Sequence, residues 1–356
     1  MLKPGDRFGD YRVRELLGRG GMGEVWRMEL ESSGRSFAVK ILDPELVAKD
    51  REFRKRFACE AEIAMVVRHP NLVRVYDVGE DPDSGLCYLI MDYMGGGSLA
   101  DRLSKRGKYA VEEAMDIVVQ LADVLELARI DGVVHRDIKP DNVMFTSDGV
   151  PKLTDLGIAR RRAVPADLNV TMPGFMIGTP EYMAPEQVID SHGVDSRADI
   201  YSLGILFHEL LTGRCPNAGL TAVQVLRRAT KGEGIADVRT VEPNVPEVVA
   251  RLISKMCETD VEKRIATPGA VAQAIRAIKE GRDPFAPPKT RDVRMRRRRR
   301  LWWIIAAGTL LAFVLLAADV TVYWLFLRKP DAEEEVDGDD FADDFYVPDA
   351  AMTSVR

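Results

Sequence analysis

The feature that most constrains the fold is a change of sequence pattern at the glycine run Gly95-Gly96-Gly97. Before this run, short apolar stretches bounded by turn residues predict strands over 11–17, 24–30, 36–42 and 87–91, with one helix over 50–67. After it, helical spacing extends over 111–130, 196–212, 220–231, 245–257 and 267–279. Strands followed by helices predict an α+β chain with two lobes, over about 1–94 and 95–280.

Charge and cysteine usage exclude several classes of protein. The formal net charge is -6, and the predicted lobes show no basic patch of the kind that binds nucleic acid, so no nucleic-acid partner is expected. The four cysteines lie far apart, without the spacing of a zinc site or of a disulfide framework. Function must therefore be sought in local motifs.

A glycine-rich segment, Leu17-Gly18-Arg19-Gly20-Gly21-Met22-Gly23-Glu24-Val25, has the spacing GxGxxG. Dinucleotide-binding folds use the same spacing, but there the loop opens a helix. Here the strand pattern resumes at Glu24, which predicts a hairpin tip where backbone N–H groups can approach phosphate oxygens. Lys40 ends the following apolar run, Phe37-Ala38-Val39-Lys40, and a strand lysine next to this loop suits phosphate binding.

Three further segments carry acid, amide and cationic side chains at fixed spacing. In the run 135–142, Asp137 stands four residues before Asp141-Asn142, so its carboxylate can accept a hydroxyl proton while the Asn142 amide oxygen coordinates Mg²⁺. Asp155, within Lys152-Leu153-Thr154-Asp155-Leu156-Gly157, would hold a metal ion that bridges two phosphates. The third segment is 178–186, Gly-Thr-Pro-Glu-Tyr-Met-Ala-Pro-Glu.

These five segments occur in one order and together resemble the protein kinase superfamily across 11–279. The segment 178–187 is most similar to the bacterial eukaryotic-like (Hanks-type) serine/threonine kinases, many of which carry a single membrane span. The resemblance implies a bilobal kinase fold and transfer of the γ-phosphoryl group of ATP to proteins, with ATP and Mg²⁺ or Mn²⁺ as cofactors. Lys139, two residues after Asp137, is typical of serine/threonine specificity. The alternative is a membrane-bound pseudokinase scaffold, although Lys40, Asp137, Asn142 and Asp155 are all present.

The resemblance also implies roles for single residues. Lys40 is expected to pair with Glu60, in preference to Glu62, and both Lys40 and Glu60 join Asp137 and Lys139 as catalytic residues. Asn142 and Asp155 would bind Mg²⁺; Glu186 would pair with Arg264; Asp199 would anchor the catalytic loop. ATP would contact Leu17, Gly18, Gly20, Gly23, Val25, Ala38, Lys40, the gatekeeper Met91, and the backbone of Asp92 and Met94, with core packing as the alternative for the two methionines.

Regulation is expected in the segment between Asp155 and Glu186, which contains Thr171 and Thr179. A phosphate on Thr171 would add negative charge that can pair with Arg136 and order this segment. The hypothesis is autophosphorylation between two molecules, which implies a homodimer; which threonine is modified stays open. Leu156 replaces the phenylalanine usual after the metal-binding aspartate, and it keeps a large apolar side chain there.

A membrane anchor is predicted over 301–327, where Asp319 is the only charged residue. Trp302 and Trp303 at one end and Tyr323 and Trp324 at the other suit two membrane interfaces. Seven arginines in 291–300, within a linker over 281–300, predict a cytosolic kinase domain over 1–280 and an acidic, disordered tail over 328–356 outside the cell membrane. The alternative is a buried core helix.

Overall fold

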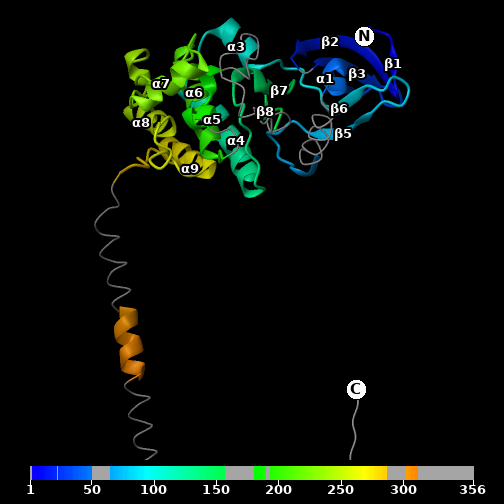
Figure 1. Cartoon of the computed structure of the whole chain (residues 1–356). Coiled ribbons are helices and arrows are strands. Elements are labelled where there is room, and N and C mark those ends of the chain that lie inside the picture. Colours follow the sequence, from blue (N-terminus) through cyan, green and yellow to red (C-terminus); the bar gives the residue numbers. More distant parts are fainter. Residues whose placement is uncertain are drawn as a thin grey trace, which may run out of the picture. The chain divides into compact units, whose positions relative to one another are not determined.

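The structure is a computed structural model that describes residues 2–21, 23–49, 65–156, 180–189, 193–286 and 302–311. The chain divides into two compact units, Met1–Phe285 and Ala286–Arg356. Within the first unit, strands gather on one side and helices on the other (Figure 1). This arrangement confirms the predicted bilobal α+β fold.

The N-terminal lobe is built on a six-stranded antiparallel sheet. In spatial order its strands are β1 (Arg7–Phe8), β2 (Tyr11–Gly20), β3 (Gly23–Leu30), β4 (Ser36–Leu42), β6 (Cys87–Asp92) and β5 (Val75–Glu80), and helix α1 (Pro44–Lys49) follows β4. Neighbouring residues of β4 point to opposite faces, so Ala38 packs in one apolar cluster with Met91, and Val39 packs in another with Trp26. Burial on both faces explains the nearly continuous apolar run of β4.

The C-terminal lobe is helical. Its helices are α3 (Leu99–Arg106), α4 (Val111–Ile130), α5 (Pro185–Ile189), α6 (Arg197–Thr212), α7 (Ala222–Thr230), α8 (Glu247–Met256) and α9 (Pro268–Lys279). Three short 3₁₀ turns, η1 (Pro140–Asn142), η2 (Pro180–Tyr182) and η3 (Val238–Thr240), and a two-stranded sheet of β7 (Val143–Phe145) and β8 (Pro151–Leu153) complete this lobe.

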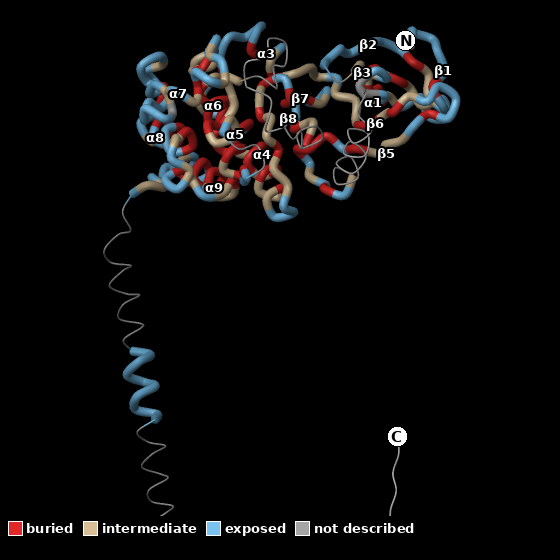
Figure 2. The backbone as a smooth tube through the Cα atoms, in the orientation of Figure 1, coloured by how far each residue is buried: buried red, intermediate tan, exposed pale blue. Residues whose placement is uncertain are grey.

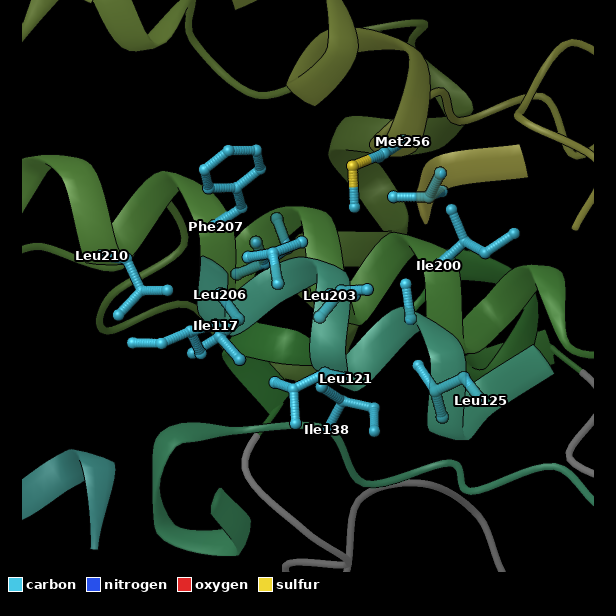
Figure 3. Packing of buried hydrophobic residues seen from close by; sticks show 14 of the residues in the cluster. Ile117, Leu121, Leu125, Ile138, Ile200, Leu203, Leu206, Phe207, Leu210 and Met256 are labelled. Atoms are coloured by element: carbon cyan, nitrogen blue, oxygen red, sulfur yellow. The ribbon is translucent and has the colours of Figure 1, made fainter. Parts of the chain in front are cut away.

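Helices α4 and α6 form the centre of the largest apolar core. Figure 3 shows Ile117, Leu121 and Leu125 of α4 facing the side chains of α6. Ile138 joins this core and is fully buried, although it lies between the predicted catalytic residues Asp137 and Lys139. Because burying one such side chain contributes about 1.5–3 kcal/mol, the core fixes the backbone of the catalytic loop from below.

Most of the predicted elements are found within a few residues of their expected limits. Helix α3 was not predicted; it starts directly after the glycine run, where Ser98 and Asp101 form a reciprocal capping box. Strands β5, β7 and β8 were also missed, and the last two have only three residues each. Residues 50–64 of the predicted helix 50–67 lie outside the described residues.

In the second unit, residues 302–311 form a helix. Its large apolar side chains, including Trp302 and Trp303, are exposed, as the pale blue colour of this segment shows (Figure 2). Within the part of the chain that the structure describes, no helix is both long and apolar enough to cross a membrane. The arginine run 291–300, residues 312–327 of the predicted span and the acidic tail 328–356 lie outside the described residues.

Candidate active site

The loop that contains Asp137 is anchored by a buried acid in the first turn of α6. The backbone N–H groups of His135 and Arg136 donate to the two carboxylate oxygens of Asp199, at 2.8 and 2.7 Å. Arg136 has a φ of +66°, a left-handed backbone conformation that a non-glycine residue adopts only at a cost. Asp199 offsets this cost, because it pairs two backbone donors that the turn leaves inside the protein.

The imidazole of His135 fixes the loop at a second point. Its Nδ1 accepts a hydrogen bond from the backbone N–H of Asp137 at 3.2 Å, so the proton of the neutral ring is on Nε2. Nε2 then donates to the carbonyl oxygen of Thr154 at 2.9 Å. The backbone before Asp155 and the backbone at Asp137 are therefore tied together through one side chain.

The Asp137 side chain contacts two polar side chains of the same loop. The Asn142 amide nitrogen donates to the Asp137 backbone oxygen at 2.7 Å and to its carboxylate Oδ2 at 3.1 Å. Lys139 Nζ lies 3.3 Å from the same Oδ2. These contacts hold the carboxylate in one orientation while a quarter of the side chain stays open to solvent, as an acceptor for a substrate proton must be.

Asp155 joins the two lobes. Lys40 of β4 donates from Nζ to Asp155 Oδ1 at 3.1 Å, across 115 residues of sequence. Burial acts to raise the pKa of Asp155, but the charge and hydrogen bond of Lys40 outweigh it, so the pKa lies below its usual value. Asp155 also has a positive φ, +58°, and the next side chain, Leu156, is buried.

The donor set fits a magnesium ion. Asp155 offers an ionised carboxylate, and because the amide nitrogen of Asn142 is used by Asp137, its amide oxygen is the atom left for a metal. Among the described residues there is no group of three or more His, Cys, Asp and Glu side chains that could hold a metal alone. Mg²⁺ commonly takes one or two protein oxygens and fills its shell with substrate phosphates and water, which this arrangement allows.

The glycine-rich segment is the turn between β2 and β3, where Gly20 pairs with Gly23. Gly23 has a φ of +141°, and an added Cβ would lie 2.0 Å from the backbone oxygen of Ile41, so only glycine fits there. An added Cβ at Gly18 or Gly20 would meet no atom within 4 Å, which leaves their backbone open to a ligand. Leu17, on the same strand, is exposed.

Four of the five apolar residues predicted to contact ATP, all except Leu17, lie in one cluster. Val25, Ala38, Met91 and Met94 all belong to it, and Ala38 stands opposite Met91 in the pairing of β4 with β6. The backbone N–H of Asp92 donates to the carbonyl oxygen of Arg74 at 3.0 Å. The side chains of Val25, Ala38, Met91 and Met94 thus form a continuous apolar surface beside the last residues of β6.

Glu186 and Arg264 form a bidentate ion pair. The two guanidinium nitrogens lie 2.5 and 3.0 Å from the two carboxylate oxygens, and the Arg264 side chain is fully buried. Arg264 also donates to the backbone oxygens of Glu258 and Arg197. All of the charge is thus matched, which a buried arginine requires.

Three predicted site residues, Glu60, Thr171 and Thr179, lie outside the described residues. The partner of Lys40 that the structure does describe is Asp155, for which the sequence predicts metal binding alone. The carbonyl of Thr154 and the amide of Gln187, which donates to the Arg136 backbone oxygen at 3.2 Å, were also missed. A backbone oxygen carries no sequence signal that could have revealed it.

Comparison with known proteins decides the family. The protein kinase domain family matches residues 11–275. The chain belongs to this family. A relative, serine/threonine-protein kinase PknA of Mycobacterium tuberculosis, is 35% identical over 285 residues, which cover 79% of this chain and 64% of PknA.

Other relatives agree with this placement of the kinase domain. Serine/threonine-protein kinase PknB of Mycolicibacterium smegmatis is 34% identical over 279 residues, covering 78% of this chain and 44% of PknB. The crystal structure of the Mycobacterium tuberculosis PknI kinase domain matches with a TM-score of 0.60 and 29% identity, over 78% of this chain and 99% of that domain. The chain thus spans less than two thirds of the length of these curated relatives.

Proposed function

We propose that this chain is an ATP-dependent protein kinase that transfers the γ-phosphoryl group of ATP to serine and threonine hydroxyls of proteins. The observation that carries the proposal is the presence of two polar groups in one site: Lys40 of β4 with Asp155, which follows β8, and Asn142 with Asp137 and Lys139 in the loop before β7. Homology to serine/threonine-protein kinases supports it. A pseudokinase is disfavoured because none of these side chains is replaced.

Each residue has a defined task in this reaction. The Asp137 carboxylate accepts the proton of the substrate hydroxyl, and Asn142 keeps that carboxylate oriented. Lys139 and Lys40 supply positive charge next to the transferred group and to the ATP phosphates. Mg²⁺, held by Asp155 and Asn142, would neutralise charge on the β- and γ-phosphate oxygens. The cluster of Val25, Ala38, Met91 and Met94 offers an apolar surface to the adenine ring.

The direct test measures phosphate incorporation by the purified full chain with ATP, Mg²⁺ and a generic protein substrate. Asp137→Asn should lower the rate by about 10²–10⁴-fold, the usual contribution of a general base. Asp148→Asn, an exposed position in the turn between β7 and β8, is the matched control and should leave the rate unchanged. Phosphotyrosine as the sole product, or full activity of Asp137→Asn, would contradict the proposal.

Activation by autophosphorylation at Thr171, between two molecules, is a second part of the proposal. Its support is Arg136, whose backbone is fixed next to Asp137 by the hydrogen bond to Asp199 and whose guanidinium could pair with a phosphate of about -1.5 to -2 charge. Mass spectrometry of active protein should find phosphate on Thr171, and Thr171→Ala should lower activity more than Thr179→Ala. Active chain should also phosphorylate Thr171 of an Asp137→Asn chain mixed with it, whereas no transfer to the inactive chain contradicts phosphorylation between two molecules.

Membrane anchoring through 301–327 completes the proposal, with the kinase domain in the cytosol and the tail 328–356 outside the inner or plasma membrane. The apolar sequence 301–318 and the preceding seven arginines support it. The exposed apolar side chains of 302–311 support it as well, because a helix of this kind is costly in water. Partners would then be anionic lipids and protein substrates at the cytosolic surface.

A further inference from the structure

The side chain of Asp92 lies at a junction of charged and polar groups from both lobes. Asp92 ends β6, where the chain leaves the sheet toward the glycine run. Its Oδ1 accepts hydrogen bonds from the Tyr76 hydroxyl at 2.7 Å and from the Arg35 guanidinium at 3.3 Å. Its Oδ2 lies 3.7 Å from the Nζ of Lys152, in β8 of the other lobe.

This cluster differs from an ordinary surface ion pair. The Asp92 side chain is 19% exposed and that of Lys152 is 17% exposed, so solvent and salt screen their attraction less than at the surface. Lys152 also donates to the backbone oxygen of Leu72 at 3.4 Å. Arg35 is held in place by the aromatic rings of Phe37 and Tyr76, whose centroids lie 4.8 and 5.1 Å from its guanidinium carbon.

The position of the cluster connects it to the active site. Met91, next to Asp92, stands opposite Ala38 in the sheet, within the apolar surface assigned to adenine. Lys152 is the middle residue of β8, and Asp155 follows three residues later. A contact between Asp92 and Lys152 therefore joins the strand that would receive the adenine ring to the strand that leads to the metal-binding carboxylate.

We propose that Asp92, Lys152 and Tyr76 form an interlobe latch, a positioning device that sets the spacing between β6 and Asp155 before ATP binds. The inference rests on the proposed function as a kinase. The latch is closed in the same structure in which Lys40 and Asp155 are paired, so it supports the assembled site. Without it, the ion pair of Lys40 with Asp155 and the backbone hydrogen bonds between Leu153 and residues 71 and 73 remain, but ATP has to order β6 relative to β8, and the entropy of that ordering weakens nucleotide binding.

The latch predicts a distinctive kinetic pattern. Lys152→Met keeps the length of the side chain but removes its charge, and it should raise the KM for ATP and the Kd of a non-hydrolysable analogue about three- to tenfold. The value of kcat should stay within about twofold, because Asp137 and its neighbours are untouched. Lys152→Arg should restore tight binding, which a purely structural role for the side chain would not explain.

A double-mutant cycle gives the sharpest test with the full chain. Asp92→Asn alone should weaken analogue binding as Lys152→Met does, and the double variant should be no weaker than either. Tyr76→Phe, which removes one hydroxyl, serves as a mild second variant if a charge change lowers the melting temperature. Lys108→Met is the matched control, since it breaks the ion pair of Lys108 with Glu242 within the C-terminal lobe.

Three results would contradict the latch. The first is a double variant whose loss of affinity for the analogue equals the sum of the two single losses, and the second is unchanged affinity for the analogue in all latch variants. The third is a rise in the kcat of these variants, which would show that the cluster restrains the enzyme. If the unmodified chain transfers phosphate while the variants bind the analogue equally tightly, the latch is wrong and the kinase proposal stands. If the unmodified chain binds no ATP at all, both proposals are wrong.

Discussion

Asp199 is the single residue on which the backbone of the catalytic loop most depends. Its two hydrogen bonds to the N–H groups of His135 and Arg136 hold the turn with the positive φ. Burial raises the pKa of Asp199, which means that folding keeps its negative charge at a cost. Asp199→Asn should therefore lower activity about 10²-fold through a misplaced Asp137, yet lower the free energy of unfolding by only about 1–2 kcal/mol.

The two effects can be separated by measuring kcat and thermal unfolding on the same preparation. Asp195→Asn is a suitable control, because Asp195 lies just before α6 and its exposed carboxylate pairs with Arg197. It should change neither quantity much, as expected of an exposed pair. If Asp199→Asn keeps full activity, Asp199 does not position the loop. If its melting temperature falls so far that no folded protein remains, the residue acts mainly on stability.

Single residues differ in how far their surroundings can be predicted from sequence. The spacing of Asp137 and Asn142 within one loop already places the two side chains together, and the structure shows them 3.1 Å apart. The contact between Lys40 and Asp155 spans 115 residues, so no local pattern reveals it. For Gly23 the motif indicates the residue type, but its reason, the backbone oxygen of Ile41, is visible only in the folded chain.

Among the elements, α4 and α9 are joined by a carboxylate that acts at the start of α9. Glu126 of α4 accepts a hydrogen bond from the backbone N–H of Gly269 at 2.9 Å and is paired with Arg129. The hydrogen bond from Arg129, aided by that of Gly269, lowers the pKa of Glu126 despite partial burial. Glu126→Gln should therefore destabilise the protein at neutral pH by about 1 kcal/mol, as the loss of a helix cap does.

The stability lost in Glu126→Gln should depend on pH, and the loss should shrink as the pH falls. Because the folded-state pKa of Glu126 is lowered, its ionised form contributes stability above the pKa of the unfolded chain. That contribution is lost as the pH falls through the folded-state pKa. Chemical unfolding from pH 7 down to pH 3 should show the two proteins converging at the acid end. A constant difference, or one matched by the surface control Glu233→Gln, would contradict the proposed cap.

Elements with a long periodic pattern were predicted well, and those fixed by tertiary contacts were not. Helix α4 coincides with the predicted range 111–130, because twenty residues supply several turns of apolar spacing. Strands β7 and β8 have three residues each, too few for any period, and exist because they pair with one another. Helix α3 is short and polar, and its capping box at Ser98 was the available signal.

At the scale of the whole molecule, the division into two compact units, Met1–Phe285 and Ala286–Arg356, implies that the kinase domain can be separated from the rest of the chain. Phe285 lies near the guanidinium of Arg251, and Asp283 pairs with the same arginine, so the contacts that close the first unit end at this point. A chain that ends at Phe285 should keep the melting temperature of the full chain within about 2 °C, because it loses none of these contacts. It should also keep its phosphate-transfer activity in solution.

Membrane binding should depend wholly on residues 286–356, which the chain that ends at Phe285 lacks. The full chain should float with vesicles of mixed neutral and anionic lipid, since each large apolar side chain of 302–311 that enters the bilayer contributes about 1.5–3 kcal/mol. The chain that ends at Phe285 should stay in the dense fraction. High salt distinguishes a span from surface attraction by the arginine run 291–300, which salt screens. If high salt releases the full chain from the vesicles, binding rests on electrostatic attraction alone and the predicted membrane span is wrong.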